Sequence, residues 1–384
     1  MYPGISDLLN DLLGTNFGIH FPPTFGTLVA ISFLFAAWTL RLELQRKEKD
    51  GLLKGQSITT IKGAPVSTSE ILWNAFFGLL IGSKLGYAIF NKAEFFENPQ
   101  AAILSLKGHY LSGFIIAGIT GYLKYREGKQ QELKEPKKEI VQQFPSELVT
   151  DFTMMAALGG LIGAKFFHLL EYWEDFIQDP IGGFFSGSGL TMYGGLIVGS
   201  ITVLWYARKH AIALLPLCDA AAPGLMLAYG TGRLGCQLSG DGDWGIVNTT
   251  SKPDWLSWLP DWCWSFKYPN NVINEGVPIP GCEGKYCYEL AAGVFPTPLY
   301  EAVTCILLFF VLWSIRKKIS GPGQIFAIYL LLNGIERFLV ELIRVNSQYH
   351  IGGFGFTQAQ LISSLLIIVG TSGYFYFRPK TVQV

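Results

Sequence analysis

The 384-residue chain has few charged residues, and their signs balance. Only 15% of its residues are charged, with 29 Lys and Arg against 29 Asp and Glu. A soluble domain usually carries about a quarter charged residues. Because there is no basic excess to hold a phosphate backbone, we expect no nucleic-acid partner. The composition instead favours an integral membrane protein.

The chain also lacks the usual signatures of a disulfide scaffold, a metal centre and a secretory leader. Six cysteines are too few for a disulfide-dense fold, and the five histidines are scattered without an HExxH or CxxC spacing. We therefore expect no metal and no cofactor. The opening MYPGISDLLNDLLG has neither a basic start nor a small-residue cleavage site, so we expect no removable signal peptide.

Long apolar runs are what the chain has in abundance. Half of its residues are hydrophobic and its mean hydropathy is +0.32. A helix needs about 20 apolar residues to cross a bilayer. We predict an all-α, polytopic membrane helix bundle, one integral membrane domain over residues 1–384 with about nine spans: Thr24–Leu40, Ile71–Ile89, Gly108–Leu123, Leu148–Leu170, Leu190–Ala207, Ala211–Leu234, Leu299–Ile315, Ile325–Ile343 and Thr357–Phe377.

Basic residues predict the orientation of this bundle. Most of the Lys and Arg residues follow spans one, three, five and seven or the last span, whereas the opposite loops carry only Lys92, Lys107, Lys252, Lys267 and Lys285. By the positive-inside rule, the N-terminus faces out and the C-terminus faces the cytoplasm.

The outer segment 236–296 is the largest polar part of the predicted fold. It holds half of the ten tryptophans, and indole rings prefer the membrane interface, so we expect it to lie along the outer leaflet. Cys263, Cys282 and Cys287 would then face an oxidising compartment. One disulfide is plausible, and Cys282 and Cys287 are the closest pair, but the sequence leaves the pairing open. Cys218 and Cys305 lie in apolar runs, which favours burial.

A weak internal repeat relates two parts of the chain. Shifting residues 82–118 by 81 positions onto 163–199 aligns GSK with GAK and superposes several glycines. Such a parallel repeat predicts two similar helix pairs, although glycine-rich apolar sequence inflates such matches.

Five cations lie in or at the ends of predicted spans: Lys84, Lys165, Arg233, Arg337 and Arg344. Each costs about 2.5–3.5 kcal/mol at a helix centre on insertion scales. For any one of them alone, a local ion pair or snorkelling is as good an explanation as a function.

Three polar clusters nevertheless fall on the same, outer side. The first is GTGRLGCQLSGDGDWG, in which Arg233 is followed by Asp241 and Asp243; its glycines let main-chain N–H groups approach an anion. The second is IERFLVELIRVN, where the i, i+4, i+7 spacing predicts one helix face that can clamp a phosphate through two guanidiniums. Its members are Arg337, Glu341 and Arg344.

The third cluster is SGLTMYGGLIVG, in which Tyr193 precedes Gly194 and Gly195. The glycine pair leaves room for a lipid or a neighbouring helix. A lone tyrosine here is more often an interfacial aromatic, so its interest comes from lying on the same side as the two arginine clusters.

These motifs resemble those of the bacterial phosphatidylglycerol–prolipoprotein diacylglyceryl transferase family. GRLGCQLSGDGDWG is similar to its Gly-Arg-x-Gly-Asn signature, Tyr193-Gly194-Gly195 to its His-Gly-Gly element, and FPTPLYE to its His-Pro-Ser-Gln-Leu-Tyr-Glu element. Its Arg-x3-Glu-x2-Arg helix is matched fully. The similarity also includes the DxxxP pattern and covers most of the chain from Leu148 onward. Residues 64–138 look like an additional helix pair with a cytoplasmic basic linker.

The resemblance implies a transferase that uses no metal and no cofactor, in a bacterial cytoplasmic (inner) membrane. The diacylglyceryl group of phosphatidylglycerol would pass to the lipobox cysteine thiol of a preprolipoprotein signal peptide, giving a thioether and glycerol phosphate. The alternative is a non-catalytic or transport-type membrane protein that binds anionic phospholipid.

The resemblance also implies roles for individual residues, and four departures from the family motifs bear on them. Tyr193 replaces the family histidine, and Cys236, Asp241 and Phe295 stand where the family has Asn, Glu and His. As catalytic candidates we take Arg233 and Arg337 to hold the phosphate, Tyr193 to orient the lipid or accept a proton, and Asp241 to anchor its loop or act as a weak base. Substrate-binding candidates are Arg233, Arg344, Glu341, Gly194, Gly195 and Glu301; Glu301, with Asp219 and Tyr300, is expected in a packing or supporting role.

Overall fold

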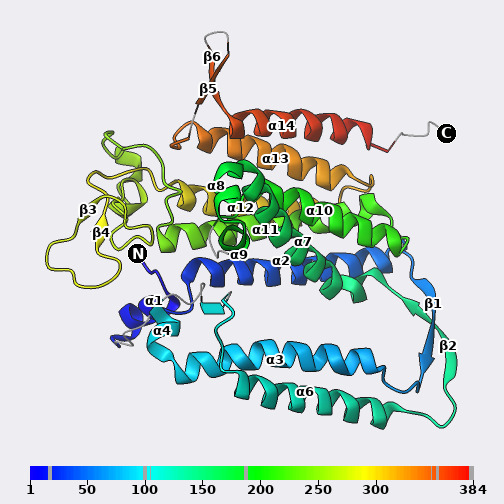
Figure 1. The fold of residues 1–384 in the computed structure, drawn as a ribbon. Coiled ribbons are helices and arrows are strands. Elements are labelled where there is room, and N and C mark those ends of the chain that lie inside the picture. Colours follow the sequence, from blue (N-terminus) through cyan, green and yellow to red (C-terminus); the bar gives the residue numbers. More distant parts are fainter. Residues whose placement is uncertain are drawn as a thin grey trace, which may run out of the picture. The chain divides into compact units, whose positions relative to one another are not determined.

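The computed structural model describes the whole chain except residues 16–19, 98–101, 104, 186–188, 347, 352–353 and 380–384. Its described part is mainly helical and divides into two compact units, residues 1–53 with 212–384 and residues 54–211 (Figure 1). The start of the third cluster at Ser188 lies outside the described residues.

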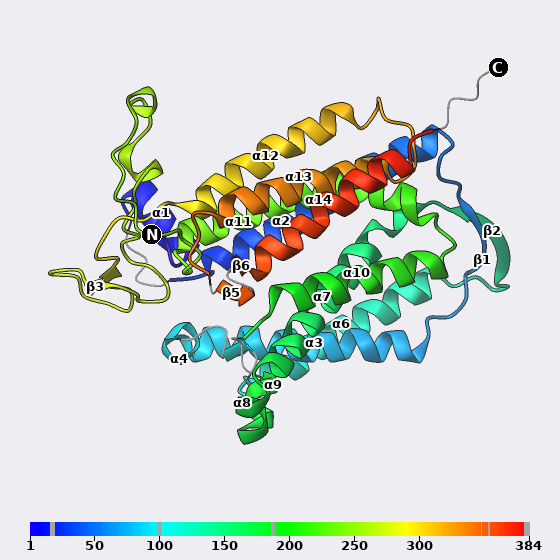
Figure 2. The ribbon, with the colours of Figure 1, turned by 90° about the horizontal axis from the view of Figure 1, so that it is seen from above.

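The first unit is a helical bundle built around α11. Its long helices are α2 (Thr24–Lys49), α11 (Leu214–Ser239), α12 (Thr297–Ile315), α13 (Gln324–Glu341) and α14 (Gln358–Tyr376), preceded by the short α1 (Ile5–Leu13). The helix α11 packs against α2, α12 and α13, and α14 packs against α13 (Figures 1 and 2). Two glycines of α11 favour this close packing: a Cβ at Gly224 would collide with α2, and a Cβ at Gly230 would be tightly crowded by α12.

The second unit contains two helix pairs and a hairpin. The helix α3 (Thr68–Phe90) packs on α6 (Tyr110–Gln131), and α7 (Val149–Glu171) packs on α10 (Met192–Lys209). The antiparallel strands β1 (Gln56–Lys62) and β2 (Lys137–Gln143) pair with each other. The strand β1 precedes α3, and β2 lies between α6 and α7. Shorter elements are α4 (Lys92–Glu97), η1 (Pro145–Leu148), α8 (Trp173–Gln178) and α9 (Pro180–Phe185).

The two pairs carry the repeat that the sequence suggested. The helix α7 begins and ends 81 residues after α3, and α8 has the same offset from α4. Equivalent glycines make equivalent contacts, since Gly78 faces a threonine of α6 and Gly159 a threonine of α10. In the first copy Lys84 donates hydrogen bonds to the carbonyls of Ala102 (2.9 Å) and Lys107 (2.6 Å), which gives this intramembrane cation a local structural role.

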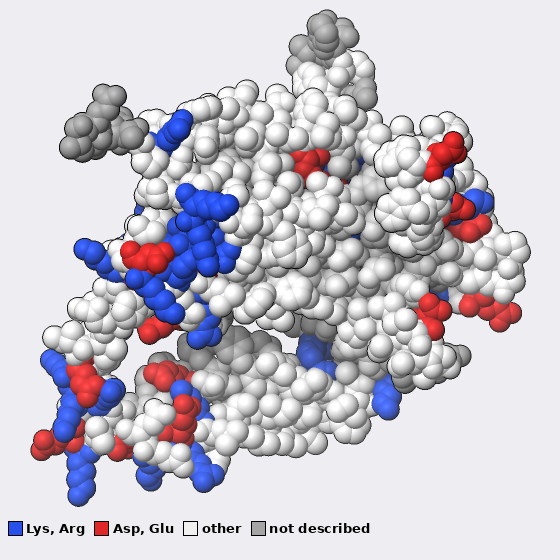
Figure 3. All heavy atoms as spheres, turned by 180° about the vertical axis from the view of Figure 1, so that it is seen from behind, with Lys and Arg blue, Asp and Glu red and all other residues white. Residues whose placement is uncertain are grey.

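Each of the nine predicted spans falls in one of these long helices. Among the described residues, five helices are apolar and long enough to cross a membrane: α2, α3, α7 with its preceding turn, α12 and α14. The other four are more polar, and α11 and α13 carry charged groups that face neighbouring helices. The helix flanks are largely uncharged (Figure 3), and large apolar side chains such as Leu34, Phe77 and Leu365 are exposed on them. These features agree with a polytopic helical membrane protein.

Residues 240–296 form a folded cap on the first unit. They contain η2 (Asp254–Leu256), η3 (Asp261–Cys263) and the paired strands β3 (Val277–Pro278) and β4 (Tyr288–Glu289). Cys282 and Cys287 form a disulfide, the pairing that the sequence had left open. The remaining hairpin of this unit is β5 (Gln348–Ile351) with β6 (Phe354–Thr357).

The tryptophans of this cap do not share one environment. Trp244 is buried against Tyr268 in the cap's own core, which differs from the interfacial position expected of it. Trp255 and Trp258 are about three-quarters exposed, at 75% and 76%. The Tyr268 hydroxyl donates to Gln237 on α11 (2.7 Å), so this core attaches the cap to the helix bundle.

At the opposite end of α11, Asp219 fixes the start of α13. Its two carboxylate oxygens accept hydrogen bonds from the main-chain N–H groups of Gly323 (2.7 Å) and Phe326 (2.9 Å), and the Lys47 ammonium lies 3.9 Å away. All of this is buried. Asp219 satisfies N–H groups that have no partner within their own helix, as a capping residue does.

We expect Asp219→Ala to lower the free energy of unfolding by about 3–5 kcal/mol, because it leaves a buried ammonium and two N–H groups without their carboxylate. Thermal unfolding in detergent measures this. Asp50→Ala is the matched control, since Asp50 pairs with Arg46 but its side chain is about half exposed and its loss should cost under about 1 kcal/mol. Equal melting temperatures for the two variants would contradict the anchoring role of Asp219.

Candidate functional site

The first element of the site is the end of α11. Arg233 lies in its last two turns and is 7% exposed. Its guanidinium stacks 5.4 Å from the ring centre of Tyr229, one turn earlier. The helix ends where Gly240 adopts a left-handed backbone with φ of 66°, a conformation that glycine takes at little cost. The chain then turns back over the helix end and carries Asp241 and Asp243.

The second element is the start of α12. Pro298 occupies its first turn, where a missing N–H costs nothing. Glu301 follows and its side chain is fully buried. The neighbouring Tyr300 donates its hydroxyl to the Cys263 carbonyl (2.8 Å), which connects α12 to the cap.

The third element is the end of α13, and it differs from the prediction. The helix ends at Glu341, so Arg344 does not lie on the same helix face as Arg337. The chain instead pairs with the loop after α11, through a bridge between Gly245 and Arg344 and a hydrogen bond from the Ile246 N–H to the Ile343 carbonyl (2.9 Å). This pairing satisfies backbone groups that would otherwise continue the helix.

Glu301 is the centre on which the three arginines converge. Its Oε1 accepts from Arg337 Nη1 at 2.8 Å and from Arg344 Nη1 at 3.1 Å, and its Oε2 pairs with Arg233 Nε. A buried carboxylate is stable only when it is paired and hydrogen-bonded. Glu301 therefore gathers three helix ends, far apart in sequence, into one cluster.

Asp243 is the second carboxylate that joins arginines from different elements. One of its oxygens pairs with Arg233 Nη1 and the other with Arg344 Nη2. Its main-chain carbonyl accepts a hydrogen bond from the Thr297 hydroxyl at 2.9 Å. Burial alone would raise the pKa of this carboxyl, but the charges of the two arginines outweigh it and lower the pKa below the ordinary value, so Asp243 is ionised at neutral pH.

Glu341 is a second carboxylate partner of Arg337. Its Oε2 lies 2.9 Å from Arg337 Nη2, while its Oε1 accepts from the Thr357 hydroxyl (2.7 Å) and the Asn346 amide (2.5 Å). One carboxylate oxygen is thus held by neutral donors while the other contacts Arg337. Glu341 can therefore orient the Arg337 guanidinium.

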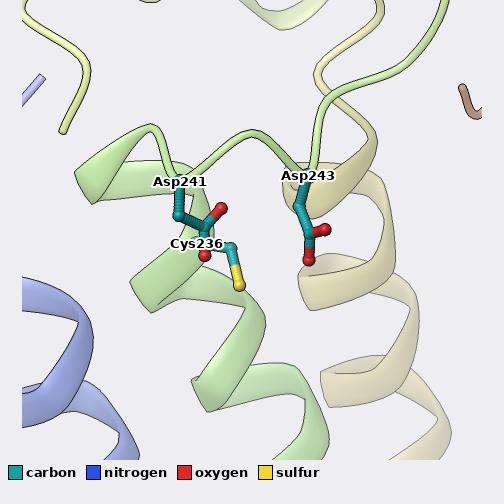
Figure 4. Close-up of side chains that lie close together, drawn as sticks. All are labelled: Cys236, Asp241 and Asp243. Carbon is teal, nitrogen blue, oxygen red and sulfur yellow. The ribbon is translucent and has the colours of Figure 1, made fainter. Parts of the chain in front are cut away.

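Asp241 lies beside the buried Cys236, apart from the arginines. The ligand atoms of Cys236, Asp241 and Asp243 lie within 4.8 Å of one another (Figure 4). A thiol and two carboxylates are chemically able to bind a metal, but both oxygens of Asp243 are already ion-paired, so we assign no metal here. Burial, and then the charge of Asp243, raises the pKa of Asp241.

Tyr193, Gly194 and Gly195 belong to the second unit. Tyr193 lies in the first turn of α10 and is partly exposed. Gly194 is buried and packs so closely on Phe167 and Gly163 of α7 that a Cβ would collide. The glycines therefore allow α10 to pack closely on α7.

The sequence does not indicate the part that three residues play in this cluster. It predicts Glu301 as a substrate-binding or supporting residue rather than as the centre of the cluster, and it gives Asp243 no role. Glu336 was missed: it is 3% exposed, and neither carboxylate oxygen has a hydrogen-bond partner in the described part of the chain. An ionised carboxylate in that position is costly, so we treat Glu336 as neutral. Its position directly before Arg337 was the available signal.

Together, the apolar helix flanks and the buried residues at the helix ends define a helical membrane protein with an ion-paired cluster of arginines and carboxylates. Comparison with known proteins gives the particular family. Residues 109–376 match the model of the prolipoprotein diacylglyceryl transferase family, and the chain belongs to that family. The match begins at His109, upstream of the Leu148 boundary of the main resemblance.

Several relatives are named phosphatidylglycerol–prolipoprotein diacylglyceryl transferase. One from Leptospira interrogans is 29% identical over 321 residues, covering 70% of this chain and 89% of the relative. One from Dehalococcoides mccartyi is 28% identical over 234 residues, covering 61% and 78%. One from Lysinibacillus sphaericus is 27% identical over 268 residues, covering 69% and 86%. These matches identify the chain as a transferase.

Proposed function

We propose that this protein transfers the diacylglyceryl group of phosphatidylglycerol to the lipobox cysteine of a preprolipoprotein. Its relatives carry the name of that activity. The observation that carries the proposal is the convergence of Arg233, Arg337 and Arg344 on one buried carboxylate. The donor is an anionic lipid, and arginines are well suited to bind a phosphate.

The reaction exchanges one bond for another. The acceptor sulfur forms a bond to the glyceryl carbon, the bond from that carbon to the phosphate oxygen breaks, and its electron pair leaves with glycerol phosphate. The thiol proton passes to a base. Negative charge therefore collects on the phosphate as it leaves, and fixed guanidinium groups stabilise that charge more in the transition state than in the bound lipid.

The three arginines divide this work in the proposed mechanism. Arg233 and Arg337 hold the phosphate and Arg344 assists them. Each guanidinium has five N–H donors, so the ion pairs with Glu301 and Glu341 orient these groups without using all their donors. The most exposed of the three side chains is Arg337, at 18%, which suits first contact with the lipid headgroup.

The acceptor thiol needs a base or a positive field, because its ordinary pKa is about 8.5. Tyr193 is the residue that stands at the family histidine, and we propose that its hydroxyl orients the donor or takes part in the proton transfer. Asp241 is the second candidate base. Burial raises the pKa of its carboxyl above the ordinary value, which makes Asp241 a stronger base than an exposed carboxylate.

We further propose that nine helices span a bacterial inner membrane, with the N-terminus outside and the C-terminus cytoplasmic. The positions of the basic residues support this orientation. The Cys282–Cys287 disulfide supports an oxidising location for residues 236–296. The exposed Trp255 and Trp258 suit contact with the outer leaflet. Residues 64–138 remain our candidate for a helix pair added to the family core.

We expect Tyr193→Phe to lower kcat/KM for transfer about ten- to hundredfold, the value of one hydrogen bond to a charged group. Tyr193→His, which restores the residue of the family motif, should recover most of the activity. Initial rates with labelled phosphatidylglycerol and a lipobox peptide measure both variants. Wild-type rates in Tyr193→Phe would exclude the hydroxyl from the reaction.

The proposed function itself is tested by genetic replacement. The gene should restore lipoprotein modification in bacterial cells depleted of their own transferase, and the Arg337→Ala variant, inserted at the same level, should not. Normal membrane insertion of the wild-type protein without any restored modification would contradict the proposal.

A further inference from the structure

The arginine cluster has no free charge with which to receive an anion. Arg233, Arg337 and Arg344 are matched by three carboxylates, Asp243, Glu301 and Glu341, each of which is ion-paired. Glu336 is buried, its carboxylate oxygens have no hydrogen-bond partner among the described residues, and it adds no charge in its neutral form. An incoming phosphodiester carries one negative charge, so a phosphate that joins this site leaves it with one carboxylate in excess.

Of the three carboxylates, only Asp243 can leave the cluster at low cost. The side chains of Glu301 and Glu341 are fully enclosed, whereas that of Asp243 is 34% exposed. Moving an ionised carboxylate within a dry interior is costly because the charge stays desolvated. Asp243 avoids this cost because it can turn toward water.

The geometry of Asp243 matches that of a bound phosphate. Its two oxygens bridge two guanidiniums, one oxygen on Arg233 and one on Arg344, as two oxygens of a phosphodiester can. Its carbonyl is held by Thr297, so the side chain can rotate away while the loop stays in place. Figure 4 shows Asp241 and Asp243 on the same loop, and an oxygen of each carboxylate lies within 4.8 Å of the other.

We propose that Asp243 occupies the place of the lipid phosphate in the resting site and is displaced by it when the donor binds. The inference rests on the proposed function in one respect, that the arginines receive a phosphate-bearing lipid. Asp243 thereby becomes a positioning residue and a specificity device. It keeps Arg233 and Arg344 aligned before the lipid arrives, and an uncharged lipid cannot take its place.

Two consequences follow for binding. Removing the Asp243 charge should tighten the binding of an anionic lipid, because the lipid no longer competes with an internal carboxylate. It should leave the binding of diacylglycerol, which has the same chains without a phosphate, unchanged. The groups facing Asp243 include two cations, Arg233 and Arg344, and one neighbouring acid, Asp241. Because Asp241 is itself a candidate base, the charge control is Glu283, an exposed acid of the cap.

The experiment measures lipid affinity without any acceptor peptide. Purified wild-type protein and the Asp243→Asn and Glu283→Gln variants are titrated in detergent with fluorescent phosphatidylglycerol and, separately, with fluorescent diacylglycerol. We expect Asp243→Asn to lower the Kd for phosphatidylglycerol about tenfold, which corresponds to about 1.4 kcal/mol. Glu283→Gln should change it by less than about threefold, because the exposed charge of Glu283 is screened by solvent and salt.

An unchanged or weaker affinity in Asp243→Asn would overturn the inference and make Asp243 a purely structural partner of the arginines. Equal tightening by Asp243→Asn and Glu283→Gln would also overturn it, because the effect would then be one of the cap's net charge in general. If Asp243→Asn does not fold, Asp243→Ser provides the same comparison. A separate transfer assay on the wild-type protein distinguishes the two claims. If Asp243→Asn binds phosphatidylglycerol more tightly but the wild type transfers nothing, only the proposed function is refuted. If the wild type transfers the lipid but Asp243→Asn does not bind it more tightly, only this inference is refuted.

Discussion

Replacing Arg233 with alanine should lower the rate of diacylglyceryl transfer by about a hundred- to a thousandfold, the usual loss when one donor to a developing negative charge is removed. Arg233 contacts both Glu301 and Asp243, as Arg344 also does. Its loss removes one side of the proposed phosphate clamp. Because three carboxylates then face two arginines, the melting temperature should fall as well, so the loss in kcat is measured on the folded fraction.

The measurement compares transfer rates and melting temperatures of three proteins. Arg41→Ala is the control, since Arg41 is an exposed arginine of the same unit and its removal should change neither value. Arg233→Lys should lie between wild type and Arg233→Ala, because an ammonium keeps the charge but not the planar fork of donors. A fully active Arg233→Ala protein would contradict the clamp.

Replacing Glu301 with alanine should destabilise the protein by about 3–5 kcal/mol, the cost of leaving buried charges without their partner. Three guanidiniums share this carboxylate, and they come from helices α11 and α13 and from the chain beyond α13. Without it they repel one another inside the fold. The melting temperature in detergent and the yield of monodisperse protein should both fall.

Glu301→Gln should be less harmful than Glu301→Ala, because the amide keeps one oxygen acceptor and the side-chain volume. Glu283→Ala removes an exposed acid from the cap and should leave the melting temperature within about 1–2 °C of wild type, as surface substitutions do. If Glu301→Ala were as stable as Glu283→Ala, the three arginines would not depend on this carboxylate.

The helices of this protein could be predicted from sequence because they depend on local apolar runs. Each predicted run falls in a helix, and the offset of 81 residues between the two helix pairs was visible as aligned glycines. The span count is harder to predict, because α11 and α13 face other helices and carry charged groups for that reason.

The sequence predicts the three arginines of the cluster but not the contacts that join them. The family motifs pointed to Arg233, Arg337 and Arg344, yet the spacing suggested that Glu341 would lie between two arginines on one face. The helix ends at Glu341, and Arg344 joins Glu301 and Asp243 instead. Such contacts join residues that are far apart in sequence, and no local pattern contains that information.

Burial in the cap was also beyond local prediction. Trp244 and Trp255 have the same side chain and lie in the same segment, but Trp244 packs on Tyr268 while Trp255 is exposed. Which of them is buried depends on how the loop folds back over the end of α11.

One measurement tests the central claim directly. Purified wild-type protein in phosphatidylglycerol vesicles is mixed with a lipobox peptide, and the products are identified by mass spectrometry. We predict a peptide that gains a diacylglyceryl group on its cysteine sulfur, together with an equal amount of glycerol phosphate. Phosphatidylglycerol that binds to the protein but stays intact in the presence of the peptide would contradict the account.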